Sequence, residues 1–180
     1  MGIIENREHA EWLKEKQLVI FDLDGTLRRC TKEGQPCPNR RGEQELLPGA
    51  QEGIQALIAR GAKLAFATNQ AGPAFGFSTR QDVNDAIRET MELAGISYTL
   101  ITGLGFGSPT TKVFVAWTKD KKGFLRKPQP GMLLKAMVEW QVEPRDTLFI
   151  GDMDSDEDAA RRANVSFIRA DVWRSYYQEK

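Results

Sequence analysis

The sequence is poor in the residues that build disulfide frameworks and zinc sites. It contains two cysteines and one histidine in 180 residues. Cys30 and Cys37 stand in a polar segment without CxxC spacing, which argues against a disulfide scaffold. Together with His9 they are the only Cys and His side chains, and their spacing does not suit a tetrahedral zinc site. A structural zinc ion is therefore not expected.

Long apolar runs and net charge are also missing. No run approaches the roughly 20 residues that cross a bilayer, and residues 1–16 are charged, without the apolar core of a signal peptide. We therefore expect a cytoplasmic protein with no membrane partner. The 25 basic and 25 acidic side chains cancel, which excludes a disordered polyelectrolyte and a strongly basic nucleic-acid coat.

No Gly/Ser linker, internal repeat or low-complexity segment divides the chain. A chain of this length buries one hydrophobic core more readily than two. We expect a single domain over residues 1–180, with its core at about 17–170, present as a monomer or a weak homo-oligomer.

What the sequence does contain is an alternation of short apolar runs with longer amphipathic ones, which predicts an α/β fold with a parallel sheet covered by helices. Polar residues 28–45 are predicted to be irregular, and the apolar run 113–117 is predicted as a hairpin arm. The helix at 79–94 should turn Val83, Ile87, Met91 and Leu93 inward. Five core strands are predicted at 18–21, 63–67, 98–102, 148–150 and 165–168, and the other helices at about 50–61, 132–140 and 155–164.

Carboxylates and other polar side chains follow three of these strands. The segments are Asp22-Leu23-Asp24-Gly25-Thr26, Thr68-Asn69-Gln70 and Gly151-Asp152-Met153-Asp154-Ser155-Asp156. Parallel strands place their carboxyl ends at one edge of a sheet, where ligands bind. Each segment alone is also ordinary turn or helix-cap chemistry. Like charges gathered from several strands repel, however, and need a cation to hold them together.

Taken with Lys127, these segments resemble the four motifs of the haloacid dehalogenase superfamily of phosphohydrolases, in the same order along the chain. Leu47-Pro48-Gly49, Thr68–Gly72 and Arg126–Met132 further resemble its small capless branch (subfamily IIIA), which holds heptose bisphosphate and histidinol phosphate phosphatases. The resemblance implies a Rossmann-like sheet with helices on both faces and no cap domain. This chain differs from that branch in lacking Cys and His between residues 103 and 125, where the branch commonly carries a zinc loop.

The resemblance also implies the roles of individual residues. Asp22 would attack phosphorus and form a phosphoaspartate, and Asp24 would act as general acid and then base. The metal would be Mg²⁺, held by Asp22, the backbone carbonyl of Asp24 and Asp152, with Asp156 either as a further ligand or as a hydrogen-bond acceptor beside the ligands. The substrate phosphate would be bound by Thr68, the backbone amide of Asn69 and Lys127, with Arg126 as a further candidate. For Lys127, a solvated loop lysine is the alternative.

Two excursions, residues 28–46 and 103–125, are too short to bury a core of their own, so we expect an open site whose loops select the substrate. A surplus of basic residues in the first excursion (Arg28, Arg29, Lys32, Arg40 and Arg41) fits a second anionic group on the substrate or a solvated loop. Phe106, Phe114, Trp117 and Phe124, in or beside the second, fit either substrate stacking or core packing.

The preferred function is therefore Mg²⁺-dependent hydrolysis of a small phosphate monoester, of the sugar phosphate or bisphosphate class. Removal of a 3′-phosphate from a nucleic-acid end is the alternative, since an open site admits a polymer end. A non-enzymatic binding module is disfavoured because Asp22, Asp24, Thr68, Lys127 and Asp152 are all present. Mutase or dehalogenase chemistry is disfavoured because those relatives generally carry a cap.

Overall fold

The computed structural model describes residues 13–96, 99–101, 105–107 and 111–178, and for 99–101 and 105–107 only the backbone. Predictions for residues 1–12, His9 included, and for the side chain of Phe106 therefore lie outside the described residues. None of the helices in these ranges has the length and apolar character that a membrane crossing requires.

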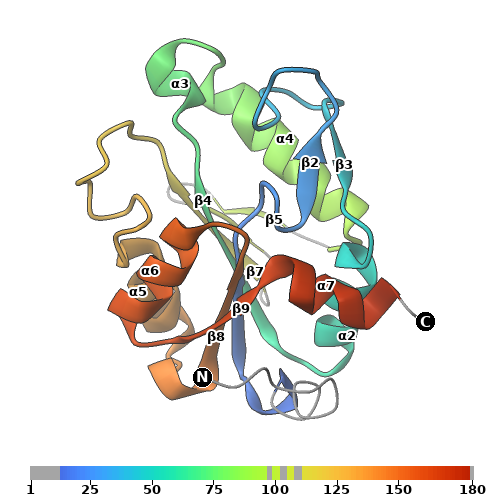
Figure 1. The fold of residues 1–180 in the computed structure, drawn as a ribbon, viewed down its shortest axis with the longest axis vertical. Helices are drawn as coiled ribbons and strands as arrows, with labels where there is room; N and C mark the ends of the chain where they lie inside the picture. The colour runs from blue at the N-terminus through green and yellow to red at the C-terminus, as the bar shows by residue number, and fades with distance from the viewer. Residues whose placement is uncertain (1–12, 97–98, 102–104, 108–110, 179–180) are drawn as a thin grey trace.

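Five parallel strands form the central sheet, in the order β7-β4-β1-β8-β9 (Figure 1). The chain passes from β1 to β4 and β7 on one side, then returns to β8 and β9 on the other. This reversal beside β1 is the point at which open α/β sheets bind ligands. The strands are β1 (Leu18–Phe21), β4 (Lys63–Asn69), β7 (Thr111–Ala116), β8 (Thr147–Gly151) and β9 (Ser166–Arg169).

Alternation along β1 divides the interior into two cores. Val19 and Phe21 face one core, whereas Leu18 and Ile20 face the other, because successive side chains of a strand point to opposite faces. The first core is covered by α2 (Ala50–Ala59), α4 (Arg80–Leu93) and α7 (Ala170–Gln178), and the second by α5 (Gly131–Trp140) and α6 (Asp154–Ala163). The predicted α/β sheet with helices on both faces is confirmed (Figure 1).

The predicted helices are confirmed to within a few residues, and the clearest sequence signal is the start of α4. The Thr79 hydroxyl accepts from the backbone N–H of Asp82, and the Asp82 carboxylate accepts from that of Thr79, which is a capping box. Leu93 was predicted to face inward, but it is exposed, because the inward stripe of α4 ends on Thr90 and Met91.

Two predictions about strands were wrong. Residues 28–45 are not wholly irregular, because β2 (Arg28–Cys30) pairs antiparallel with β3 (Gln44–Leu46). The run 113–117 is not a hairpin arm: β7 pairs in parallel with β4 at the edge of the main sheet. The prediction of a core strand at 98–102 is right about the strand but wrong about its place, because β5 (Thr99–Ile101) pairs with β6 (Gly105–Gly107) in a separate two-stranded sheet, and β7 is the fifth strand of the central sheet. Tyr98 and Thr102 lie outside the described residues.

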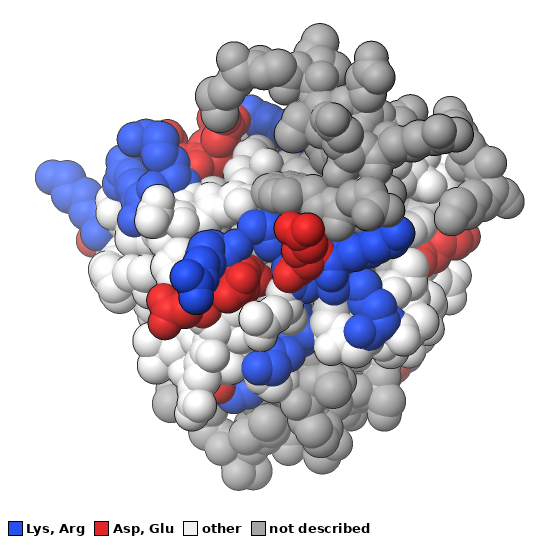
Figure 2. All heavy atoms as spheres, turned by 90° about the horizontal axis from the view of Figure 1, so that it is seen from below, with Lys and Arg blue, Asp and Glu red and all other residues white. Residues whose placement is uncertain are grey.

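The remaining elements connect the sheet at its two ends. The short α3 (Gly72–Phe75) follows β4, and the 3₁₀-helix η1 (Pro144–Asp146) precedes β8. Figure 2 shows the end of the molecule at which the strands begin, where Lys and Arg side chains are interspersed with Asp and Glu. Lys112 Nζ, near the start of β7, lies 3.0 Å from Glu139 Oε2. The acidic residues predicted to share a site lie at the opposite end of the strands.

Candidate active site

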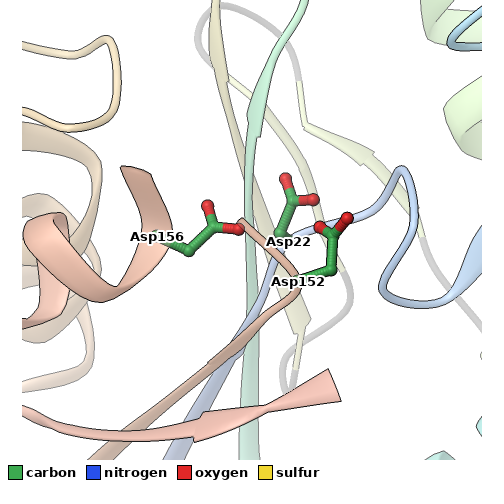
Figure 3. A group of neighbouring side chains, drawn as sticks. All are labelled: Asp22, Asp152 and Asp156. Carbon is green, nitrogen blue, oxygen red and sulfur yellow. The ribbon is translucent and has the colours of Figure 1, made fainter. Parts of the chain in front are cut away.

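Three carboxylates converge at the carboxyl end of the central strands. Asp22 follows β1, Asp152 follows β8, and Asp156 lies in the first turn of α6 (Figure 3). Each offers an oxygen, and these three oxygens lie within 4.8 Å of one another. Adjacent parallel strands bring Asp22 and Asp152 together, because Phe21 pairs with Ile150 and the Asp22 amide donates to the Ile150 carbonyl.

Lys127 joins two of these carboxylates from the loop that precedes α5. Its Nζ lies 2.5 Å from Asp22 Oδ1 and 2.7 Å from Asp156 Oδ1. The lysine is only 4% exposed, so the alternative of a solvated loop lysine is wrong. One cation faces three carboxylates, which leaves an excess of negative charge in a largely buried site.

The crowding of these groups shifts their pKa values. Burial raises the pKa of Asp22 to about 7; Lys127 opposes this shift, whereas Asp156 and Asp24 reinforce it. The pKa of Asp152 is raised by burial and then by Asp156. Burial acts to lower the pKa of Lys127, but Asp22 and Asp156 outweigh it, so the net shift is upward. Lys127 is therefore held as a cation between its two carboxylates.

Two glycines allow the carboxylates to approach the backbone. Gly25 has φ of +80°, and a Cβ there would lie 2.1 Å from Asp152 Oδ2. A Cβ on Gly151 would lie 2.5 Å from the Cβ of Asp156. A side chain at either position would displace a carboxylate of the cluster, because real carbon atoms do not approach so closely.

The Thr68-Asn69-Gln70 segment at the end of β4 makes hydrogen bonds within itself and to the loop that carries Lys127. The Thr68 hydroxyl is buried and accepts a 2.8 Å hydrogen bond from Gln70 Nε2. The Asn69 side chain instead pairs with the backbone of Lys127: its Nδ2 donates to the Lys127 carbonyl at 3.1 Å, and its Oδ1 accepts from the Lys127 amide at 3.0 Å. The Asn69 side chain thus holds the lysine loop in place.

Asp24 lies beside the cluster and is held by two side chains. Arg28 Nε donates to Asp24 Oδ1 at 2.7 Å, and Gln70 Nε2 donates to Asp24 Oδ2 at 2.7 Å. Arg28 is fully buried, so for this residue neither alternative given for the basic residues of the first excursion, a second anionic group on the substrate or a solvated loop, is correct. Cys37 also interacts electrostatically with Asp24, and burial raises the pKa of its thiol to about 11.

The structure does not bring every predicted residue into the cluster. Arg126 Nη1 donates to the carbonyl of Thr118, within its own loop. Phe114 is buried in the second core, which confirms core packing and not substrate stacking for this residue. Phe124 is 62% exposed. Sequence reasoning missed Arg174 of α7, whose Nη1 donates to the carbonyls of Gly25 and Thr26.

Comparison with known proteins places this fold and site in a class. Residues 109–170 match the family model of haloacid dehalogenase-like hydrolases. A relative 30% identical over 154 residues covers 83% of this chain, and the alignment spans 78% of that relative. The chain belongs to this hydrolase family, and it is one of the family's phosphatases.

That relative is the D-glycero-beta-D-manno-heptose-1,7-bisphosphate 7-phosphatase of Pasteurella multocida. A phosphoglycolate phosphatase of Nitrosococcus oceani is 29% identical over 72% of this chain, but the match spans only 46% of that protein. Among solved structures, the D,D-heptose 1,7-bisphosphate phosphatase of B. bronchiseptica, complexed with magnesium and phosphate, has a TM-score of 0.67 and 26% identity, over 84% of this chain and 78% of that one. The predicted resemblance to heptose bisphosphate phosphatases is confirmed.

Proposed function

We propose that this chain is a Mg²⁺-dependent phosphomonoesterase that releases phosphate from a small phosphorylated sugar, of the sugar phosphate or bisphosphate class, through a phosphoaspartyl intermediate. The observation that carries the proposal is the convergence of Asp22, Asp152 and Asp156 around Lys127. The names of the relatives at 30% and 26% identity support the substrate class.

The chemistry of the acidic cluster fits a divalent cation. Three carboxylate oxygens within 4.8 Å of one another, only partly neutralised by one lysine, form a hard, anionic donor set of the kind Mg²⁺ prefers. Asp22, Asp152 and Asp156 would hold the ion, with the backbone carbonyl of Asp24 as a further ligand. The bound ion would neutralise charge, so that an anionic nucleophile and a phosphate dianion can approach each other.

Hydrolysis would proceed in two displacements. An oxygen of Asp22 attacks phosphorus, and the bond between phosphorus and the alcohol oxygen breaks as Asp24 gives its proton to that oxygen. A water molecule then attacks the same phosphorus while Asp24 takes one of its protons, and the bond to Asp22 breaks. Inorganic phosphate leaves, and both carboxyl groups regain their starting states.

The phosphoryl oxygens would be held by groups from two other segments. The Thr68 hydroxyl accepts from Gln70 and still has its own proton to donate. The Asn69 backbone amide would donate a second hydrogen bond, and Lys127 would supply positive charge. Arg126 lies in the loop before Lys127 and would contact a more distant part of the substrate.

We further propose that residues 1–180 act as one catalytic domain without a cap. The first excursion forms the β2–β3 hairpin, which contacts α4 and does not make a second core. The substrate would then be selected by loops at the open end of the sheet.

The first test replaces the nucleophile. Asp22→Asn keeps the size of the side chain but removes the attacking oxygen, so we expect phosphate release from para-nitrophenyl phosphate in Mg²⁺ to fall by at least about 1,000-fold. Asp24→Asn should nearly abolish turnover of sugar phosphates. Asp158→Asn is the matched control, since this carboxylate of α6 is exposed and pairs with Arg161. Wild-type activity in Asp22→Asn would refute the mechanism.

The substrate class needs its own assay. We expect kcat/KM to be highest for a sugar phosphate or bisphosphate when a panel of these is compared with a 3′-phosphorylated oligonucleotide. A higher kcat/KM on the oligonucleotide would refute the sugar phosphate as the substrate class and favour removal of a 3′-phosphate from a nucleic-acid end. Failure of EDTA to remove the activity would refute the metal requirement.

A further inference from the structure

Asp24 is fixed at both of its carboxylate oxygens. Arg28 Nε holds Oδ1 and Gln70 Nε2 holds Oδ2, each at 2.7 Å, and Arg28 Nη2 lies 3.5 Å from Oδ2. Two donors on two different oxygens determine the plane of the carboxyl group as well as its position. This is the group that the proposed function uses to move a proton.

Arg28 is an unusual residue to find in this position. Its side chain has no exposed surface, and the Asp24 side chain is 19% exposed. Removing a guanidinium from water costs several kcal/mol unless a charge and hydrogen bonds compensate it. Asp24 supplies a hydrogen-bond acceptor in either protonation state, and it also supplies the negative charge once it has given its proton to the leaving alcohol, so the two residues hold each other in one geometry.

The other edge of the guanidinium is anchored to β3 and α4. Arg28 Nη1 donates to Gln44 Oε1 and to Thr90 Oγ1, both at 2.9 Å. Gln44 Nε2 in turn donates to the Ala86 carbonyl at 2.6 Å and to Glu89 Oε2 at 2.7 Å. A chain of buried hydrogen bonds thus runs from α4 through Gln44 and Arg28 to Asp24.

We propose that Arg28 is the positioning residue for proton transfer by Asp24. Its hydrogen bonds to β3 and α4 fix the guanidinium, and the guanidinium fixes the orientation of the carboxyl group that protonates the leaving alcohol. This inference rests on the proposed function. It gives the first excursion, residues 28–46, a role in orienting the proton donor in addition to the predicted role in selecting the substrate. Arg28 has no exposed surface with which to bind a substrate, and its side-chain hydrogen bonds go to Asp24, Gln44 and Thr90.

The test compares leaving groups. A sugar phosphate needs its alkoxide protonated, whereas para-nitrophenolate leaves without a proton, so only the first depends on a well-placed acid. We expect Arg28→Lys to lower kcat/KM for the sugar phosphate by about 10- to 100-fold, and for para-nitrophenyl phosphate by less than about threefold. The parameter kcat/KM is used because it reports the steps up to cleavage of the ester, before water attacks.

Two controls separate positioning from general damage. Arg29→Lys alters the next residue of β2, whose side chain is 64% exposed and pairs with Glu45, and should leave both substrates unaffected. In an Asp24→Asn background, Arg28→Lys should lower kcat/KM by no more than about twofold further, because residues that act as a unit are not additive. Equal slowing of both substrates, or full additivity, would overturn the proposal while leaving the phosphatase function intact.

A second variant covers the case in which Arg28→Lys does not fold. Thr90→Val keeps the shape of the side chain but removes the hydroxyl that accepts from Arg28. We expect about a threefold loss of kcat/KM, again on the sugar phosphate alone. Loss on both substrates to the same extent, with a native melting temperature, would also contradict the proposal. Wild-type enzyme without phosphatase activity would instead refute the proposed function.

Discussion

At the scale of the residue, the site depends on side chains that place other side chains. Asn69 was predicted to serve the substrate through its backbone amide, and its side chain makes two reciprocal hydrogen bonds with the backbone of Lys127. Lys127 then bridges Asp22 and Asp156. The lysine loop therefore owes its position to an amide at the end of β4.

We expect Asn69→Asp to lower kcat by about 10- to 100-fold, because a carboxylate oxygen would face the Lys127 carbonyl where the amide now donates. The same change should cost about 1–3 kcal/mol of unfolding free energy, since one buried hydrogen bond is lost. Steady-state kinetics and urea denaturation measure the two effects. Gln81→Glu, on the exposed face of α4, is the control; unchanged kcat in Asn69→Asp would contradict the role of Asn69.

The sequence was sufficient to predict the neighbourhood of Asp22, Asp152 and Asp156, because carboxyl ends of parallel strands meet at one edge. It was not sufficient for Arg28. An arginine among polar residues is usually solvated, and only the fold shows that Thr90, distant in sequence, covers it. The residues proposed to act on the substrate lie in short motifs that can be read from the sequence. The residues that support them are brought together only by tertiary packing, which the sequence does not reveal.

At the scale of the element, the helices were easier to predict than the strand order. Helix ends carry local signals, such as the capping box of Thr79 and Asp82. The place of β7 depends on its pairing with β4, which involves residues more than 40 positions away. Neither apolar content nor periodicity distinguishes an edge strand of a parallel sheet from a hairpin arm.

The sequence gives no indication of a role for α7, yet this helix bonds to the loop that carries Asp24 and contacts the end of β1 beside Asp22. Trp173 is fully buried against Phe21, with ring centroids 4.9 Å apart, and Arg174 Nη1 donates to the Thr26 carbonyl at 2.6 Å. One residue of α7 therefore packs against the end of β1, and the next bonds to the backbone of the loop that follows it.

We expect Arg174→Gln to lower kcat about tenfold, because Gly25 and Thr26 lose their donor and the loop with Asp22 and Asp24 gains freedom. The melting temperature should change by only a few degrees, as one or two partly exposed hydrogen bonds are lost. Arg161→Gln, an exposed arginine of α6, is the control. The prediction would be wrong if the activity of Arg174→Gln fell only as far as the fraction of folded enzyme fell. In that case α7 would contribute to stability but not to the geometry of the site.

At the scale of the whole molecule, the acidic cluster makes stability depend on pH and metal. The pKa of Asp22 is raised to about 7 from its ordinary 3.8, so the folded state holds a proton that the unfolded state has already lost between these values. In the absence of metal, the free energy of unfolding should therefore fall as pH rises from about 4 to about 7.

Mg²⁺ at about 100 times its dissociation constant should restore about 3 kcal/mol at neutral pH, since it binds the folded state alone. Thermal unfolding across this pH range, with EDTA and with Mg²⁺, measures both effects. Asp22→Asn removes the titrating group, and its metal-free stability should depend less on pH. If the metal-free stability of wild type and of Asp22→Asn had the same pH dependence, protonation of Asp22 would not be the cause of the loss of stability.

The position of α7 also has a consequence for how activity arises during synthesis. Asp22 and Asp24 precede Arg174, which bonds to the backbone of their loop, by about 150 residues in the sequence, so the ribosome makes them first. A growing chain would carry Asp22 and Asp24 long before Arg174 could hold their loop in place. We therefore expect phosphatase activity to appear only after α7 has packed against the sheet and bonded to this loop.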